Sequence, residues 1–466
     1  MTKTCLLFLT CAAILPMSAL GAPLVVTSSA DSGEGTLRAA LDQAATAEDA
    51  ATVVIATDSD IGIAASLTYD GTAPLTILGA SRTIRADGNF HILHATQGAD
   101  LHLVDLTLRG PGGFSIEARG DADGVAGKGV FVDLRDDQDG TVSVEFDRVT
   151  VADVAGHGVH VSDCSLSDAC GAGGGGAGDG SPASISIRAA ELKIENVGQG
   201  RFDADGLRVD ERGAGDIRFT ATDSVFTGVG ADGVELDEGQ AGDVIVRVTG
   251  GAFDANGDYC DPARLAAFMP AEPEGEFAEG TMAQDAIPAA ISGSPDDTCF
   301  EREVDLYDDG SVEAYEFAID TDDGFDIDEA GEGSIQAVFY GSSISGNFDE
   351  GLDFDEEDAG DIALTLVATT ATGNTDDGYK NSEEGDGSVT GVILGAVAGD
   401  NGGVGFVFEE ADGGDTHVTA TGIATAGNDD GETGLEVVQE DAGRGSLTII
   451  GGEIADGQKV EGVDLM

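Results

Sequence analysis

The chain has 466 residues, 41% of them hydrophobic, and it carries a formal net charge of −68. This hydrophobic content is enough to bury an interior, which excludes wholesale disorder. The charge excludes simple electrostatic binding to bare nucleic acid or to an anionic membrane, and it favours divalent cations or a basic partner, although an acidic surface screened by counterions explains it equally well.

Residues 1–21 have the pattern of a secretory signal peptide. Lys3 supplies a positive start, the apolar run CLLFLTCAAIL follows, and the small-residue segment ALG ends at Gly21. No later apolar run approaches the ~20 residues that a membrane helix requires. We therefore expect an exported chain, periplasmic, cell-surface or secreted, without a transmembrane segment.

Four cysteines remain once the signal peptide is removed, namely Cys164, Cys170, Cys260 and Cys299. An even number in an exported protein favours two disulfides. The local pairing joins Cys164 to Cys170 and Cys260 to Cys299. A metal site is the alternative, but no CxxC motif or Cys/His cluster supports it.

Residues 22–120 are expected to form an N-terminal cap and the first turns of the fold. A strand at 24–27 precedes Thr36, which can cap a short helix with Leu37 and Leu41 on one face. The segment DSGEGTLRAA, residues 31–40, resembles the DSGxGSLRxAI segment that opens many bacterial secreted right-handed parallel β-helix repeat proteins. The later LHLVDLTLRG resembles the first full rung of that family. The resemblance implies this fold and export, but no activity, because family members differ widely in what they do.

A repeat of 27 residues organises the chain after residue 121, and its glycines and asparagines are Gly324, Gly351, Gly378 and Gly405, with Asn347, Asn374, Asn401 and Asn428. Such a period indicates a solenoid, and three strands in each repeat predict an all-β, right-handed parallel β-helix over 121–466. Leucine-rich repeats fit less well because no helix separates the strands. A propeller blade would need about 40 residues or more.

The first strand of each repeat reads Gly-Φ-x-Φ-x, where Φ is apolar. Because side chains alternate between the two faces of a strand, positions one and three after the glycine are predicted to point inward. Phe325 and Ile327 are examples, and Asn381 is an exception that needs a buried partner. The recurring asparagines are predicted to stack and to bond to one another and to the backbone.

Two insertions interrupt the repeats. Residues 164–182 are rich in glycine, and residues 258–302 contain five prolines and two cysteines. Long loops in a compact fold are usually functional or disordered. We therefore regard 258–302 as a candidate contact surface for a partner.

Acidic residues recur at positions four and five after each glycine and directly before it, on the predicted outer side. Stacked repeats would bring equivalent carboxylates within roughly 5 Å of each other, where like charges cost about 1 kcal/mol even in water. Calcium would relieve this repulsion, because it binds carboxylate and carbonyl oxygens; diffuse screening by cations is the alternative. The predicted ligands are Asp322, Asp323, Asp328, Asp349, Glu350, Asp355, Asp376 and Asp377.

Position two after each glycine is predicted to face solvent. Lys380 beside Asp353, with Arg208 in the same column, is the arrangement that most resembles a lyase centre. A surface ion pair explains Lys380 without catalysis. The absence of tryptophan and an aromatic content of 5% argue against a carbohydrate cleft.

The sequence therefore favours a non-catalytic exported protein, with a binding or structural role, a calcium-recruiting acidic face and a monomeric state. A polysaccharide lyase or epimerase acting on the first-strand face is one alternative. An adhesin-like module that contacts a surface protein through 258–302 is another. Divalent cations and polysaccharide are the expected partners, and nucleic acid is not.

Overall fold

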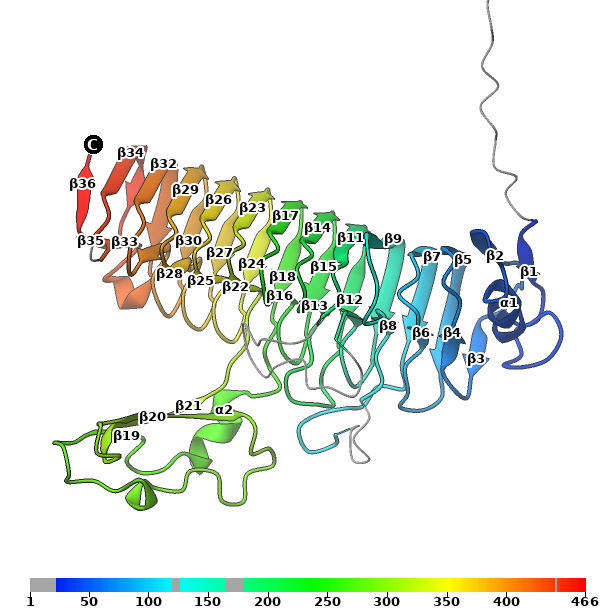
Figure 1. The fold of residues 1–466 in the computed structure, drawn as a ribbon, viewed down its shortest axis with the longest axis horizontal. Helices are drawn as coiled ribbons and strands as arrows, with labels where there is room; N and C mark the ends of the chain where they lie inside the picture. Colours follow the sequence, from blue (N-terminus) through cyan, green and yellow to red (C-terminus); the bar gives the residue numbers. More distant parts are fainter. Residues whose placement is uncertain (1–21, 120–125, 165–179, 441) are drawn as a thin grey trace, which may run out of the picture.

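The computed structural model describes residues 22–119, 126–164, 180–440 and 442–466. It is an all-β, right-handed parallel β-helix, in which strands stack side by side along the long axis (Figure 1). This confirms the fold predicted from the repeats.

A 12-stranded parallel sheet forms one side of the solenoid and carries the first strand of each rung. Its strands are β4 (Leu67–Tyr69), β6 (Leu93–Ala95), β8 (Val130–Asp133), β10 (Val159–Ser162), β13 (Leu207–Glu211), β16 (Val234–Glu238), β22 (Phe325–Gly331), β25 (Leu352–Asp358), β28 (Ser382–Gly385), β31 (Val407–Glu410), β33 (Leu435–Gln439) and β35 (Gln458–Glu461).

A 21-stranded sheet contains the other strands of the rungs. These are β1 (Leu24–Val26), β2 (Ala51–Ile55), β3 (Ile61–Ile63), β5 (Leu75–Ala86), β7 (Leu101–Arg109), β9 (Thr141–Ala152), β11 (Ser184–Ala190), β12 (Lys193–Glu195), β14 (Ile217–Thr222), β15 (Val225–Thr227), β17 (Val244–Thr249), β18 (Ala252–Asp254), β23 (Ile335–Tyr340), β24 (Ser343–Ser345), β26 (Ile362–Val367), β27 (Thr370–Thr372), β29 (Val389–Leu394), β30 (Val397–Gly399), β32 (Thr416–Ala426), β34 (Gly445–Ile454) and β36 (Val463–Leu465).

The core follows the predicted alternation. Phe325 pairs with Leu352, 27 residues later, and Ile327 pairs with Phe354 in the same register. All four side chains are fully buried. Burial of this kind contributes roughly 1.5–3 kcal/mol for each large apolar side chain.

Helix α1 (Leu37–Ala44) closes the N-terminal end of the solenoid. The Thr36 side chain accepts a hydrogen bond from the Ala39 backbone N–H, as a helix cap does, and Leu37 and Leu41 are buried. The remaining helical segments are α2 (Pro262–Leu265), η1 (Ala266–Phe268), η2 (Gln284–Ala286) and η3 (Asp429–Gly431). Among the described residues, no helix is long and apolar enough to cross a membrane.

A ladder of buried asparagines follows one edge of the solenoid, as predicted. Asn347 donates from both its backbone N–H and its side-chain amide to Asn374 Oδ1, at 3.1 and 3.0 Å. Asn374 donates to Asn401 Oδ1 in the same way, at 3.1 Å for both bonds. The ladder also includes Asn256, which precedes the strict repeat, and it ends at Asn428.

Replacing Asn374 by alanine is expected to destabilise the fold by about 2–4 kcal/mol, because buried donors of Asn347 lose their acceptor. Chemical or thermal unfolding followed by circular dichroism measures the loss. Thr372→Ala, at a half-buried position in the same rung, is the control. Equal stability of the two variants would show that the ladder adds nothing to stability.

A second ladder corrects the prediction that the acids at position five lie outside. Position five is an odd position, so its side chain points inward like positions one and three. Each carboxylate accepts a backbone N–H from the glycine four residues later, at 2.6–3.2 Å. These buried residues, the glutamate column, are Glu211, Glu238, Glu329, Glu356, Glu383 and Glu410.

The insertion after β18 is longer than 258–302, because β20 and β21 continue it to Ile319. It holds a three-stranded antiparallel sheet of β19 (Glu274–Glu276), β20 (Phe300–Leu306) and β21 (Val312–Ile319). Cys260 and Cys299 form the predicted disulfide. The predicted pair of Cys164 and Cys170 lies outside the described residues, since Cys170 falls in 165–179, as does most of the glycine-rich insertion.

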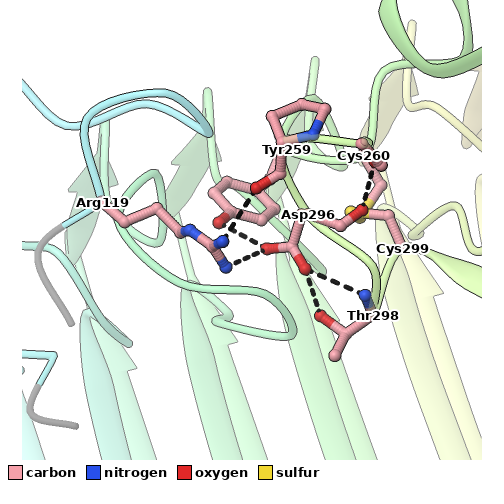
Figure 2. The surroundings of a disulfide bond; sticks show 8 residues. Arg119, Tyr259, Cys260, Asp296, Thr298 and Cys299 are labelled. Carbon is pink, nitrogen blue, oxygen red and sulfur yellow. Dashed lines mark hydrogen bonds and ion pairs between the residues drawn. A yellow bond between two sulfur atoms is a disulfide. The ribbon is translucent and has the colours of Figure 1, made fainter. Parts of the chain in front are cut away.

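Buried Asp296 joins the insertion to the solenoid beside the disulfide (Figure 2). Its carboxylate accepts a hydrogen bond from Arg119 Nη1, in the segment after β7, at 2.7 Å. Within the insertion it also accepts from the Tyr259 hydroxyl at 2.9 Å and from the Thr298 hydroxyl and backbone N–H. The base of the insertion is therefore fixed by charge, hydrogen bonds and a covalent bond together.

Candidate functional site

The outer face of the 12-stranded sheet carries an unbroken column of side chains at position two of each rung. Register pairs place them next to one another in the order His94, Phe131, His160, Arg208, Glu235, Asp326 and Asp353, with Lys380 in the next rung. The prediction that this column faces solvent is wrong for its central members, because Arg208 and Glu235 are only 6% and 5% exposed.

Three polar side chains from three adjacent rungs form a hydrogen-bonded relay on this face. Lys128 Nζ contacts His160 Nδ1, and His160 Nε2 lies 2.5 Å from Asp210 Oδ2. The Lys128 ammonium also lies 4.3 Å from the centre of the Phe131 ring. An amine, an imidazole and an orienting carboxylate in this order can move a proton.

The surroundings set the protonation of the relay. Burial lowers the pKa of Lys128 to about 7. Burial and then the neighbouring Lys128 lower the pKa of His160 to about 4. Burial opposes ionisation of Asp210, but Arg208 and His160 outweigh it and hold the pKa of Asp210 well below its usual range. Near neutral pH, His160 is therefore neutral, Asp210 is ionised, and Lys128 exchanges its proton readily.

His157 and Asp205 form a second histidine–carboxylate pair beside the relay. His157 Nδ1 accepts the backbone N–H of Asp205 at 3.0 Å and lies 3.1 Å from its Oδ2. Burial lowers the pKa of His157 well below its ordinary value and raises that of Asp205 to about 6. Because Nδ1 is an acceptor, the neutral imidazole carries its proton on Nε2.

Arg208 is the cation around which the buried carboxylates gather. Its guanidinium donates hydrogen bonds of 2.5–3.0 Å to Asp203, Asp210, Glu235 and Asp237. A guanidinium can satisfy several carboxylates at once, whereas a buried carboxylate without a partner is costly. Arg208 therefore holds the centre of the face together.

Several groups of three carboxylates lie close enough to hold a metal ion. In each group the carboxylate oxygens lie within 4.8 Å of one another; the groups are Asp203–Asp205–Glu235, Glu235–Asp326–Asp328, Asp323–Asp349–Glu350 and Asp323–Asp326–Asp353. Arg208 already neutralises part of the first two groups. The last contains Asp326, which pairs with no Lys or Arg among the described residues, and Asp353, whose Oδ2 pairs with Lys380 and whose Oδ1 is buried without a partner.

The predicted metal ligands separate into two sets. Asp328, Asp349 and Glu350 each belong to one of these groups and Asp323 belongs to two, whereas Asp322, Asp355, Asp376 and Asp377 belong to none that the described residues form. Some of these carboxylates also bond to the backbone of the next rung. Asp323 Oδ1 accepts the Glu350 N–H at 2.7 Å, and Asp377 accepts that of Val404.

Lys380 forms the ion pair that the sequence indicated. Its Nζ lies 2.7 Å from Asp353 Oδ2 and 3.6 Å from Glu350 Oε1. Burial opposes the charged amine, but Asp353 and its acidic neighbours raise the pKa of Lys380 above its usual range. It is therefore held as a cation. Arg208 lies on the same face, three rungs away from Asp353 and four from Lys380.

The sequence did not predict Lys128 of the relay or His157 beside it as site residues. Lys128 and His157 stand directly before Gly129 and Gly158, at the position that is acidic in later rungs. Basic residues at this otherwise acidic position are the signal that could have identified them. These side chains are buried although they lie outside the apolar core, and this burial lowers their pKa values. The sequence pattern does not indicate such burial.

Comparisons with known proteins give no family. No family model matches the chain, and no curated protein matches it. A search of solved structures finds ORF18 of Geobacillus virus E2, with 9% identity and a TM-score of 0.40; the match covers 86% of this chain and 57% of ORF18. It also finds the A-module of mannuronan C-5 epimerase AlgE6 from Azotobacter vinelandii, with 13% identity, a TM-score of 0.37 and coverage of 94% of this chain and 97% of the module. Pectate lyase Pel9A matches with 12% identity, a TM-score of 0.36 and coverage of 96% of this chain and 79% of the lyase. This chain thus spans little more than half of the length of ORF18. Similarity at this level carries no information about activity.

Proposed function

We propose that this protein is an exported polysaccharide-acting enzyme of the lyase or epimerase class, and that the outer face of the 12-stranded sheet is its site. The observation that carries the proposal is the Lys128–His160–Asp210 relay. A disulfide at Cys260–Cys299 supports an exported location, since such bonds persist in oxidising compartments. This proposal favours the catalytic alternative over a purely binding role.

The reaction we propose begins with removal of the proton at C5 of a uronate residue. The neutral amine of Lys128 donates one N–H to His160 Nδ1, which leaves its lone pair free for the substrate. The C5–H bond breaks, the proton passes to Lys128 Nζ, and the electron pair moves into the substrate carboxylate. A base with a pKa near the working pH suits this step.

The second step distinguishes the two enzyme classes. In an epimerase, C5 takes a proton on its opposite face; in a lyase, the bond from C4 to its oxygen breaks and the leaving oxygen takes the proton. His157 Nε2–H is the proton donor we assign to either step. The Asp205 backbone N–H fixes this tautomer by bonding to Nδ1.

The length of the row of polar side chains on this face supports a polymeric substrate. Polar side chains occupy consecutive rungs from β6 to β28, and each rung adds about 4.8 Å. Small-molecule sites are instead concave and largely apolar. A row of polar groups of this length suits a chain of sugars.

Calcium is the cation that fits the acidic end of the face. Asp323, Asp326 and Asp353 offer only carboxylate oxygens, which calcium prefers over nitrogen and sulfur ligands. When bound there, three or more rungs from His160, calcium would supply positive charge to hold a carboxylate elsewhere on the polymer against a protein of net charge −68.

Incubation with polyuronates in deuterated buffer tests the proposal. With calcium present we expect loss of the C5 proton signal in proton NMR, and at least about tenfold slower loss with excess EDTA, because an anionic polymer needs a bridging cation here. C5 carries deuterium after epimerisation and a double bond after elimination. An unsaturated product, seen by ultraviolet absorbance, identifies a lyase, and an inverted C5 without unsaturation identifies an epimerase.

Magnesium at matched ionic strength is the control for charge screening alone. Binding of polyuronate with neither deuterium at C5 nor an unsaturated product in any buffer would contradict catalysis and support the binding role. Exchange that persists unchanged in EDTA would contradict the calcium assignment while leaving the relay intact.

A further inference from the structure

The glutamate column points into the solenoid, away from the proposed site, and that site makes no use of it. Its C-terminal members lie in neighbouring strands. Glu356 pairs in register with Glu383, Glu383 with Glu410, and Glu410 with Gln439. The three glutamates are at most 1% exposed. The last position of the column is therefore an amide in place of an acid.

Each glutamate uses one oxygen in the same way and leaves the other facing its neighbour in the column. Glu383 Oε1 accepts the Gly387 N–H at 2.9 Å, and Glu410 Oε1 accepts that of Gly414 at 2.6 Å. Glu383 Oε2 is buried and has no partner apart from the neighbouring acids. A buried oxygen in this position needs a hydrogen-bond donor.

Gln439 shows which donor the column requires. Its Nε2 donates to Glu410 Oε2, while its Oε1 accepts the Thr416 N–H at 2.8 Å. The asparagine ladder has the same pattern, with an amide N–H between each pair of rungs. An ionised carboxylate has no hydrogen to donate, so two stacked carboxyl groups can bond only when one of them carries a proton.

The charged groups around the column supply no other compensation. Glu383 faces Glu356 and Glu410, and Glu410 faces Asp412 and Asp415. Among the described residues, no Lys or Arg lies within ion-pair distance of any member of the column. Calcium takes six to eight oxygen ligands, and no group of three acids forms between these rungs.

We propose that Glu383 is a neutral acid in the folded protein that donates its O–H to Glu356, and that this proton makes the C-terminal rungs sensitive to alkaline pH. The hydrogen-bonding pattern and burial carry the inference. Burial also raises the pKa of Glu383 to about 8, as expected of a proton held in this way.

The direction of the pH effect follows from proton linkage. In the unfolded chain Glu383 ionises near its ordinary pKa of about 4.3, whereas in the fold it keeps its proton to about 8. The stabilising contribution is therefore complete below the unfolded pKa and is lost as pH rises through this window. Ionisation of the stacked acids then opposes the fold.

Glu383→Gln in the full chain tests the proposal, because glutamine replaces the O–H donor with an N–H donor that does not titrate. We expect its thermal midpoint to match the wild type at about pH 4.5 and to exceed it by several degrees at about pH 9. The matched control is Glu384→Gln, the exposed neighbour, which also replaces one carboxyl group by an amide and should follow the wild type.

A midpoint for Glu383→Gln that falls with pH as steeply as the wild type would overturn the proposal. Restoration of wild-type stability at about pH 9 by calcium would also overturn it, since a cation would then occupy the column. If Glu383→Gln does not fold, Gln439→Glu provides a second test. It extends the column by one acid, so its stability should fall more steeply with pH than that of the wild type.

Discussion

Replacing Lys128 by methionine is expected to slow loss of the C5 proton in deuterated buffer at least about a hundredfold, because the variant loses the group assigned as base. Methionine keeps the apolar stem over Phe131, so the solenoid should fold normally. The same exchange assay measures the loss, and circular dichroism checks the fold. Lys193→Met, which removes an exposed lysine of β12, is the matched control and should retain full exchange.

The pH profile separates a base from a merely structural lysine. The wild-type rate should rise with pH and level off above about 7, because only the neutral amine accepts the proton. Asp210→Asn should change this profile through His160, which it positions. Lys128→Met with unchanged exchange, or a rate that is flat across this range, would show that the relay is not the catalytic group.

Replacing Arg208 by methionine is expected to destabilise the protein by about 3–5 kcal/mol near neutral pH, because several buried carboxylates lose their shared cation. The loss should shrink as pH falls, since protonated carboxyl groups need no counter-charge. Unfolding in denaturant at several pH values measures both effects.

Arg188→Met provides the comparison for Arg208. Arg188 is 57% exposed in its pair with Glu145, so its removal should cost no more than about 1 kcal/mol. A loss at Arg208 as small as that at Arg188 would mean that solvent or cations reach the face and replace the guanidinium.

The repeat made the fold predictable, because a buried position must recur wherever its environment recurs. The glycine register, the inward apolar residues and the asparagine ladder all follow from one alternation rule applied at one period. The same alternation, continued from position three to position five, also turns Glu356 and Glu383 inward. Their acidity suggested an exposed position, but a backbone N–H from a nearby glycine and the neighbouring acids satisfy them inside.

The candidate site was less predictable, because its properties arise from burial outside the core. Lys128, His160 and Asp210 come from three rungs of unequal length, so the sequence spacing between them has no period. Only the register of β8, β10 and β13 places them in contact. The low pKa of the lysine then depends on its surroundings, which a column of sequence letters does not describe.

Phe325 pairs with Leu352, and Asn347 with Asn374, each 27 residues later, so the solenoid can change in length by whole repeat units. Deletion or duplication of one whole unit would rejoin both ladders and the apolar core in phase. A change by an odd number of residues would turn inward residues outward, and a change by any number other than a whole unit would interrupt both ladders. Gain or loss of whole 27-residue units can therefore lengthen or shorten the acidic part of the solenoid, while the N-terminal rungs that carry the relay remain as they are.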